Sequence, residues 1–140
     1  MTYYIQIDAG NAVTGCFTEA SDGFSELENL IELSQSDTVT LRSCKYGWPV
    51  MDYVAGALQI SAARCQPLEA ADTIAEIKRE AALRIDAAYP FYKQVNAIAE
   101  GDTSVSVAIK VIRDLSDDLE SRVAAGEAVD IAAEFNTVAV

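Results

Sequence analysis

A proline inside a helical pattern is the feature that most constrains this chain. Upstream of Pro90, apolar residues recur at steps of three and four, which is the spacing of one face of an α-helix. They are Ile74, Ile77, Ala81, Ile85 and Ala88. Pro90 cannot donate to the carbonyl four residues back, and its ring moves Tyr89 away from α geometry. The sequence therefore predicts a helix over 67–88 that kinks or breaks at Pro90.

The chain after Pro90 predicts two further helical segments. A shorter helix resumes and runs to Glu100, and the polar turn at 101–104 can cap the helix that follows. In that next helix the apolar positions again step by three and four: Val105, Ala108, Ile112, Leu115, Leu119 and Val123. Gly126 can end it in a left-handed cap. Two amphipathic helices with a short kinked connection predict an antiparallel helical hairpin.

The apolar stripes of these helices allow two arrangements. They face each other and the N-terminal part, or they are shared between copies of the chain in a dimeric or trimeric bundle. Alanine permits close helix approach but buries little surface, so a narrow stripe that contains alanine leans toward an oligomer, with a trimer favoured. The residues predicted to contact a partner are Trp48, Ile74, Ile77, Ala81, Ile85, Tyr89, Tyr92, Ile112, Leu115 and Leu119.

The start of the chain predicts a β-hairpin and one short helix. Apolar and polar residues alternate over 3–8 with the period of a half-buried strand. Turn residues occupy 8–11, and 12–18 is apolar enough to return as a second strand. Capping residues precede an apolar pattern over 27–33, which predicts the short helix. The β-branched segment 38–42 predicts a third strand.

A second hairpin is predicted over 50–60, with its turn at Ala55 and Gly56, and 61–66 reads as a linker. A last helix is possible over 129–135. The apolar tail 138–140 would be unusual for a free monomer, since terminal residues are normally frayed and solvated.

The predicted elements give an α+β fold. A small β-rich docking domain of hairpins and one short helix spans 1–66, and a helical hairpin that serves oligomerisation spans 67–140.

Aromatic residues gather at two places. Trp48, beside Tyr46 and Tyr53, either covers the sheet or forms a platform for carbohydrate or peptide, and the first interpretation is the commoner one. Around Pro90, Tyr89, Phe91 and Tyr92 are expected to pack the elbow of the hairpin, with an interface as their second role.

Composition excludes several classes of function. The chain has 22 acidic and 10 basic residues, a net charge of −12, which would repel nucleic acid and anionic membranes. It has no histidine, and therefore neither a Ser-His-Asp triad nor an imidazole zinc site. No glycine-rich phosphate loop is present. We therefore expect no enzyme, no cofactor and no metal.

Two further groups of side chains could carry chemistry, the clustered aspartates of one helix and the three cysteines. Asp114, Asp117 and Asp118 are interpreted as a solvated helix face, because a calcium site needs oxygens that converge from a turning loop. Cys16, Cys44 and Cys65 are far apart in sequence, which favours reduced thiols and synthesis in the cytoplasm. Neither a signal peptide nor a transmembrane helix is expected.

One run of the chain resembles a known group of proteins. The run is Ile85-x-x-x-Tyr89-Pro90-x-Tyr92-Lys93-Gln94-x-Asn96, followed by Ala108, Ile112-Arg113 and Ser116. It resembles the helical region of small tailed-phage proteins that are often encoded near tail-fibre genes, among them tail-fibre-assembly-like proteins, although Tyr92 stands where tryptophan is usual. The segments Ile5-Gln6-Ile7-Asp8-x-Gly10-Asn11 and Tyr53-Val54-x-Gly56-Ala57-Leu58 resemble that group loosely. The resemblance implies a phage tail component or a chaperone for one, without an active site.

The sequence therefore leaves two functions, a preferred one and an alternative. The first is a phage structural or assembly protein, made in the host cytoplasm and located in the virion tail, that binds tail or tail-fibre proteins and forms a homo-oligomer. The alternative is a small acidic regulatory binding module without enzymatic activity, which occupies a basic partner as a monomer.

Overall fold

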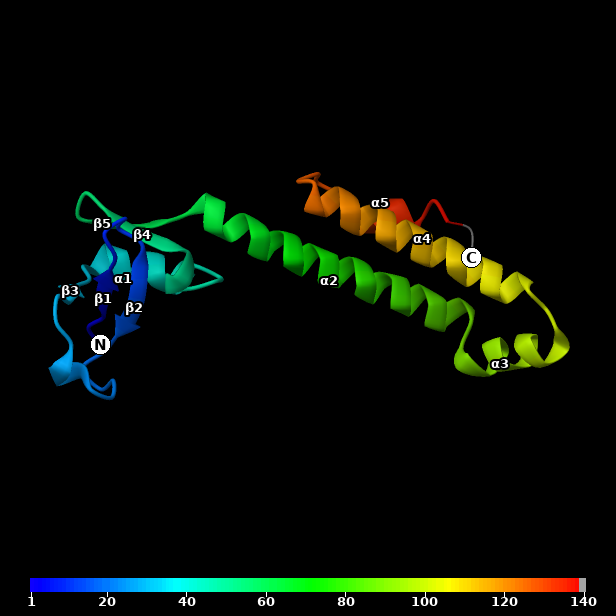
Figure 1. The fold of residues 1–140 in the computed structure, drawn as a ribbon, viewed down its shortest axis with the longest axis horizontal. Helices are drawn as coiled ribbons and strands as arrows, with labels where there is room; N and C mark the ends of the chain where they lie inside the picture. Colours follow the sequence, from blue (N-terminus) through cyan, green and yellow to red (C-terminus); the bar gives the residue numbers. More distant parts are fainter. Residues whose placement is uncertain (139–140) are drawn as a thin grey trace. The chain divides into compact units, whose positions relative to one another are not determined.

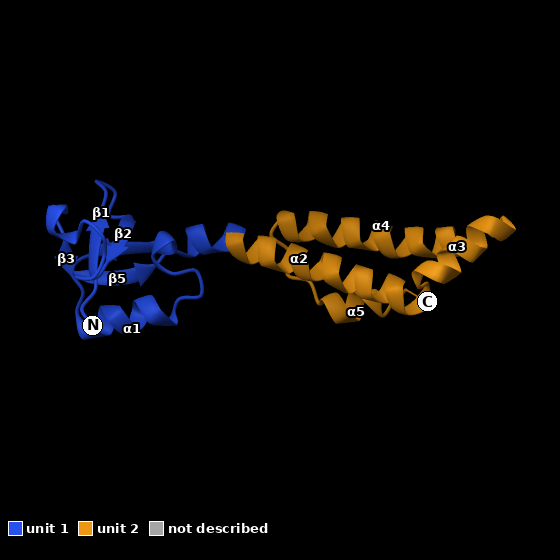
Figure 2. Ribbon diagram, turned by 90° about the horizontal axis from the view of Figure 1, so that it is seen from below, with its two compact units in different colours: residues 1–67 blue, residues 68–140 orange. Residues whose placement is uncertain are grey.

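The chain forms two compact units, Met1–Pro67 and Leu68–Val140 (Figure 2). The structure is a computed structural model, and it describes residues 1–138. Over these residues the fold is α+β, as predicted, with small β-sheets and short helices in the first unit and longer helices in the second (Figure 1).

The first unit is built on the predicted N-terminal hairpin. Strands β1 (Tyr4–Ile7) and β2 (Val13–Phe17) pair antiparallel, and β3 (Ile31–Glu32) pairs with the other edge of β1, giving the order β2-β1-β3. The carboxylate of Asp8 closes the turn by accepting from the backbone N–H groups of Gly10 and Ala12 at 2.8 and 2.9 Å. The hairpin prediction is confirmed.

Two local predictions in this unit are wrong. The segment 27–33 is not a helix: a 3₁₀ turn, η1 (Phe24–Glu26), is followed by β3. Asn29 has a φ of 58°, which a helix does not allow, and pairing with β1 lets Ile31 pack against the core around the fully buried Ile5.

The segment 38–42 is not a strand but part of helix α1 (Gln35–Ser43). Ser34 caps this helix, accepting from the backbone N–H of Asp37 at 3.1 Å and donating to its carboxylate at 2.7 Å. The other carboxylate oxygen of Asp37 accepts from the N–H of Leu58 at 2.8 Å, which ties α1 to the second hairpin. The cap and this long-range bond outweigh the β-propensity of the segment.

The second predicted hairpin is confirmed. A 3₁₀ turn, η2 (Trp48–Val50), leads into β4 (Met51–Val54), which pairs antiparallel with β5 (Ala57–Ile60). Ala55 and Gly56 both have positive φ, 54° and 80°, as a tight two-residue hairpin turn requires.

The predicted linker 61–66 is wrong, because helix α2 (Ala62–Ala88) begins there. The side chain of Arg64 bonds to the carbonyl oxygen of Met51 at 2.5 Å and forms an ion pair with Asp52. These contacts hold the first turn of α2 against β4, so Pro67 lies inside the helix rather than at its start.

The second unit contains the rest of α2 together with α3 (Phe91–Glu100), α4 (Ser104–Ala124) and α5 (Ile131–Phe135). The break at Pro90, the short helix to Glu100 and the long helix after it are confirmed. Gly126 ends α4 as predicted, with a φ of 90°. The N–H of Gly126 donates to the carbonyl oxygen of Val123, and the N–H of Glu127 donates to the carbonyl oxygen of Arg122, both at 3.0 Å.

In the second unit α2 and α4 lie side by side and α5 packs on them (Figures 1 and 2). Asp130 caps α5 by accepting from the N–H of Ala133 at 3.0 Å. The predicted last helix is therefore present, over Ile131–Phe135. Of the predicted exposed tail, Val138 packs against the core, and residues 139–140 lie outside the described part of the chain.

Candidate functional site

Most of the predicted contact residues lie in the core of the second unit. Ile77, Ala81, Ile112 and Leu119 are at most 6% exposed, in one cluster with Phe135. The half-buried residues Ile74, Ile85 and Leu115 pack against it. Within the second unit the stripes of α2 and α4 face each other and α5.

Two arginines hold α5 over this core. Arg84 donates to the carbonyl oxygen of Phe135 and to the side-chain oxygen of Asn136, both at 2.9 Å, and its guanidinium lies 5.5 Å from the centre of the Phe135 ring. Arg122 pairs with Glu127 and Glu134, both at 2.9 Å, and these hydrogen bonds raise the pKa of Arg122. The chain thus covers its own stripe.

The other predicted contact residues are distributed over the two units. Trp48 is half-buried and packs against the core of the first unit, which also contains Ile5 and Met51. Tyr89 is half-buried at the end of α2. Tyr92, on α3, is 62% exposed, which makes it the one predicted contact residue that is mostly open to solvent.

The residues that carry the phage resemblance build the bend between α2 and α3. The side-chain amide of Gln94 donates to the carbonyl oxygen of Tyr89 at 2.7 Å, and the Lys93 ammonium reaches that of Ala88 at 3.5 Å. The backbone N–H groups of Lys93 and Gln94 both bond to the carbonyl oxygen of Pro90. The two side-chain bonds satisfy carbonyls that the end of α2 leaves free, and the two backbone bonds to Pro90 begin α3. Together they fix the direction in which α3 leaves the bend.

An apolar surface on α3 is the most distinctive exposed feature of the second unit. We call it the α3 face; it consists of Phe91, Tyr92, Val95 and Ile98, which are 79%, 62%, 45% and 80% exposed. The other side of the helix is anchored by the buried Ala97. Phe91 and Tyr92 therefore do not pack the elbow, contrary to the prediction, because the backbone and amide bonds of the bend close it without their rings.

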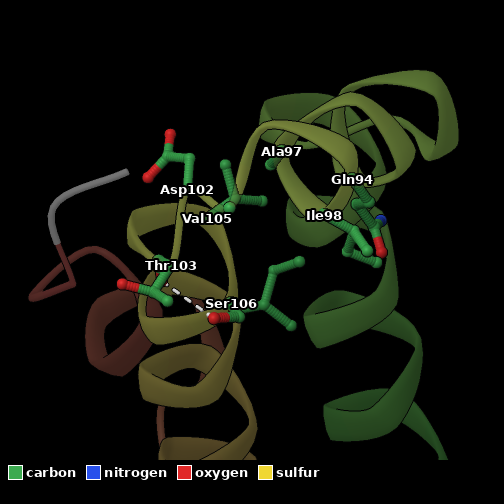
Figure 3. A pocket seen from close by; sticks show the side chains of 9 residues that line it. Gln94, Ala97, Ile98, Asp102, Thr103, Val105 and Ser106 are labelled. Carbon is green, nitrogen blue, oxygen red and sulfur yellow. Dashed lines mark hydrogen bonds between the residues drawn. The ribbon is translucent and has the colours of Figure 1, made fainter.

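A small pocket adjoins the α3 face at the turn between α3 and α4. Its volume is about 240 Å³, and Ile98 belongs to both its wall and the α3 face. Figure 3 shows Gln94 and Ile98 on one side of the pocket and Val105 on the other. The hydroxyl of Ser106 donates to the backbone carbonyl of Thr103 at 2.8 Å. Hydrogen bonds from Ser104 lower the pKa of Asp102, which keeps a negative charge in the lining.

A second, more polar groove of about 460 Å³ runs between α2 and α4. Four residues of the phage-like pattern line it, although they come from three helices: Ile85, Gln94, Arg113 and Ser116. Lys78, Asp86 and Asp117 add charges of both signs. Gln94 lines the groove and the apolar pocket alike, so the two hollows are neighbours.

Over residues 1–138 no group of histidine, cysteine and carboxylate side chains could hold a metal ion, and no helix is both long and apolar enough to cross a membrane. Two of the clustered aspartates form ion pairs along α4, Asp114 with Lys110 at 2.6 Å and Asp118 with Arg122 at 3.7 Å. The cysteines are free thiols, and burial raises the pKa of Cys16.

Comparison with protein-family models, with curated proteins and with solved structures found no match for this chain.

Proposed function

We propose that this chain is a structural or assembly protein of a bacteriophage tail that acts by binding other proteins. The observation that carries the proposal is the α3 face, where four large apolar side chains on a ten-residue helix stand 45–80% exposed. An exposed contiguous apolar surface is typical of a protein–protein contact site, and aromatic residues such as Phe91 and Tyr92 supply much of the binding energy in such sites.

The assignment to a phage tail is supported by the resemblance of the run from Ile85 to Asn96 to small proteins of the tail-fibre region. That run determines how α3 leaves α2, and so it positions the α3 face. We propose tail or tail-fibre proteins as partners, with the protein made in the host cytoplasm and acting at the virion tail. The acidic remainder of the surface would discourage wrong contacts.

The predicted homo-oligomer, with a trimer favoured, stays a prediction. The stripes from which it was inferred lie in the core of the second unit. An oligomer would therefore have to form through another surface, and the α3 face is available for it.

The experiment is complementation in the phage or prophage that carries this coding sequence. The gene is deleted and replaced with the wild-type chain, with Ile98→Ser or with Leu83→Ser. Leu83 is the matched control, because it is a 57% exposed aliphatic residue on α2 that is not part of the α3 face. Circular dichroism of the purified variants checks that both keep the helical fold.

We expect deletion to give particles with defective tails or few infectious particles, seen by electron microscopy and by titre. Leu83→Ser should restore them and Ile98→Ser should not. Complete tails and a normal titre without the gene would refute the proposal.

The net charge of −12 favours the alternative, an acidic regulatory module that occupies a basic partner. Salt separates the two functions. A contact made by charge weakens steeply between low and high ionic strength, whereas docking through an apolar face does not.

A further inference from the structure

We infer that the α3 face pairs with the α3 face of a second copy of this chain. The inference depends on the proposed function, since it names one partner of the same surface.

The α3 face carries no charge in a chain that is strongly acidic. The charged residues of α3 are Lys93 and Glu100, and at 3.6 residues per turn both fall on the side of the helix away from Val95. The neutral side chains of Gln94 and Asn96 flank the face. Two copies that each carry a charge of −12 repel one another through most of their surfaces. The four side chains of the α3 face put no carboxylate at the contact, and the carboxylate of Asp102 lies in the wall of the adjoining pocket instead.

The same property argues against a basic partner at this place. The α3 face offers such a partner no carboxylate, whereas acidic residues elsewhere on the second unit do, for instance Glu69, Asp86 and Asp117, all exposed. A basic protein would be drawn to those surfaces instead. The uncharged face therefore fits a partner whose contact surface is apolar and whose remaining surface is acidic. Another copy of this chain meets that description.

The area of the face suits a weak, self-complementary pair. Given their exposed fractions, its four side chains present about 500 Å² of surface, if a fully exposed large side chain offers roughly 150–250 Å². Two copies would bury about 1,000 Å², which is near the lower limit for a specific interface.

A two-fold symmetric pair would bring all four side chains of the α3 face into contact. In a two-fold, antiparallel arrangement of α3 helices, Phe91 at one end meets Ile98 at the other end of its counterpart, and the contact repeats about the axis. The pocket of about 240 Å³ beside Ile98 leaves room for an apolar side chain of the second copy.

Analytical ultracentrifugation of the full chain tests the pairing, over concentrations from about 1 μM to about 1 mM. We expect the mass to rise from 15.0 kDa toward twice that value. Association should strengthen with salt, because the Debye length shortens from about 10 Å at 0.1 M to about 3 Å at 1 M and screens the repulsion between the acidic surfaces. Ile98→Ser and Phe91→Ser should each weaken association about ten-fold or more, since each dimer loses the contact twice. Leu83→Ser should leave it unchanged.

A photo-crosslink maps the contact. With p-benzoylphenylalanine at position 92, irradiation of the associated chain should join residues of α3 to α3 of the second copy, as identified by mass spectrometry. Crosslinks that fall mainly outside α3 would overturn the inference. So would a mass that stays at 15.0 kDa throughout, or association that weakens as salt is added.

The inference and the proposed function fail in different ways. A monomeric chain whose Ile98→Ser variant still cannot complement the phage would overturn the pairing and leave the tail function standing. A dimer formed through α3 in a phage whose tails are complete without the gene would overturn the tail function alone.

Discussion

Removing the ring of Phe135 should selectively destabilise the second unit. Phe135 is fully buried and closes the core over Ile77, Ile112 and Leu119. A buried Phe→Ala substitution typically costs about 3–5 kcal/mol in transfer energy and cavity. Arg84 also loses the ring over which its guanidinium lies. Since small domains have about 5–15 kcal/mol of stability in total, we expect a large fraction of the stability of this unit to be lost.

Two signals make the test specific. Trp48 is the single tryptophan and lies in the first unit, so its fluorescence follows that unit, whereas far-UV circular dichroism mainly follows the long helices. In urea, Phe135→Ala should lower the midpoint seen by circular dichroism and leave that of Trp48 fluorescence nearly unchanged. Leu83→Ala, on an exposed site, should shift neither signal by more than about 0.5 kcal/mol. A loss below about 1 kcal/mol in the Phe135 variant, or equal shifts of both signals, would refute the account of α5 as the cover of this core.

Three further predictions concern single contacts. Asp37→Asn should cost the first unit about 1–3 kcal/mol in Trp48-monitored unfolding, because the bonds from Leu58 and Ser34 are lost or weakened. Burial alone would raise the pKa of Asp37, but these bonds outweigh burial and lower the pKa. The stabilisation that the Asp37 carboxylate gives the fold is therefore present above the ordinary carboxyl pKa. It is lost as the pH falls through the pKa of Asp37 in the folded protein. The Asn variant should lack this acid-dependent loss, and an unchanged loss would contradict the assignment. Gly126→Ala, at a φ of 90°, should cost the second unit about 1–2 kcal/mol by circular dichroism, and a neutral result would mean that the cap is not strained. Gln94→Ala should cost about 0.5–1.5 kcal/mol by the same assay, since Tyr89 loses its side-chain donor, and a stabilised variant would show that the bend does not need it.

Elements with a strong local signal could be predicted from the sequence. Pro90 breaks the helix because its ring and missing N–H act on their own neighbours, and Gly126 and the Ala55–Gly56 turn depend on local backbone conformation alone. The α+β fold class follows from these elements and from the helical periodicity that surrounds Pro90.

The errors lie where a distant contact decides the structure. The segment 38–42 is helical partly because Asp37 bonds to Leu58, and 61–66 is helical because Arg64 reaches β4. Neither contact can be read from a window of neighbouring residues. Local propensity predicted a strand over 38–42 and a linker over 61–66, but tertiary contacts stabilise a helix in both segments.

The candidate site was only partly predictable. The partner contacts were predicted on the long apolar stripes of α2 and α4. Nothing in the spacing of these residues shows whether α5 or another chain covers them. The α3 face had a signal of its own: Phe91, Val95 and Ile98 recur at steps of four and three. It was interpreted as elbow packing, because the sequence does not show that backbone and amide bonds close the bend by themselves.

The role of the α3 face is tested most directly by one comparison, the titre of infectious particles restored by Ile98→Ser relative to Leu83→Ser in the phage that lacks the gene. If the protein works through the α3 face, the first variant yields few infectious particles while the second matches the wild type, with both chains equally abundant and folded. Equal titres from the two variants would contradict the claim that this face is where the protein acts.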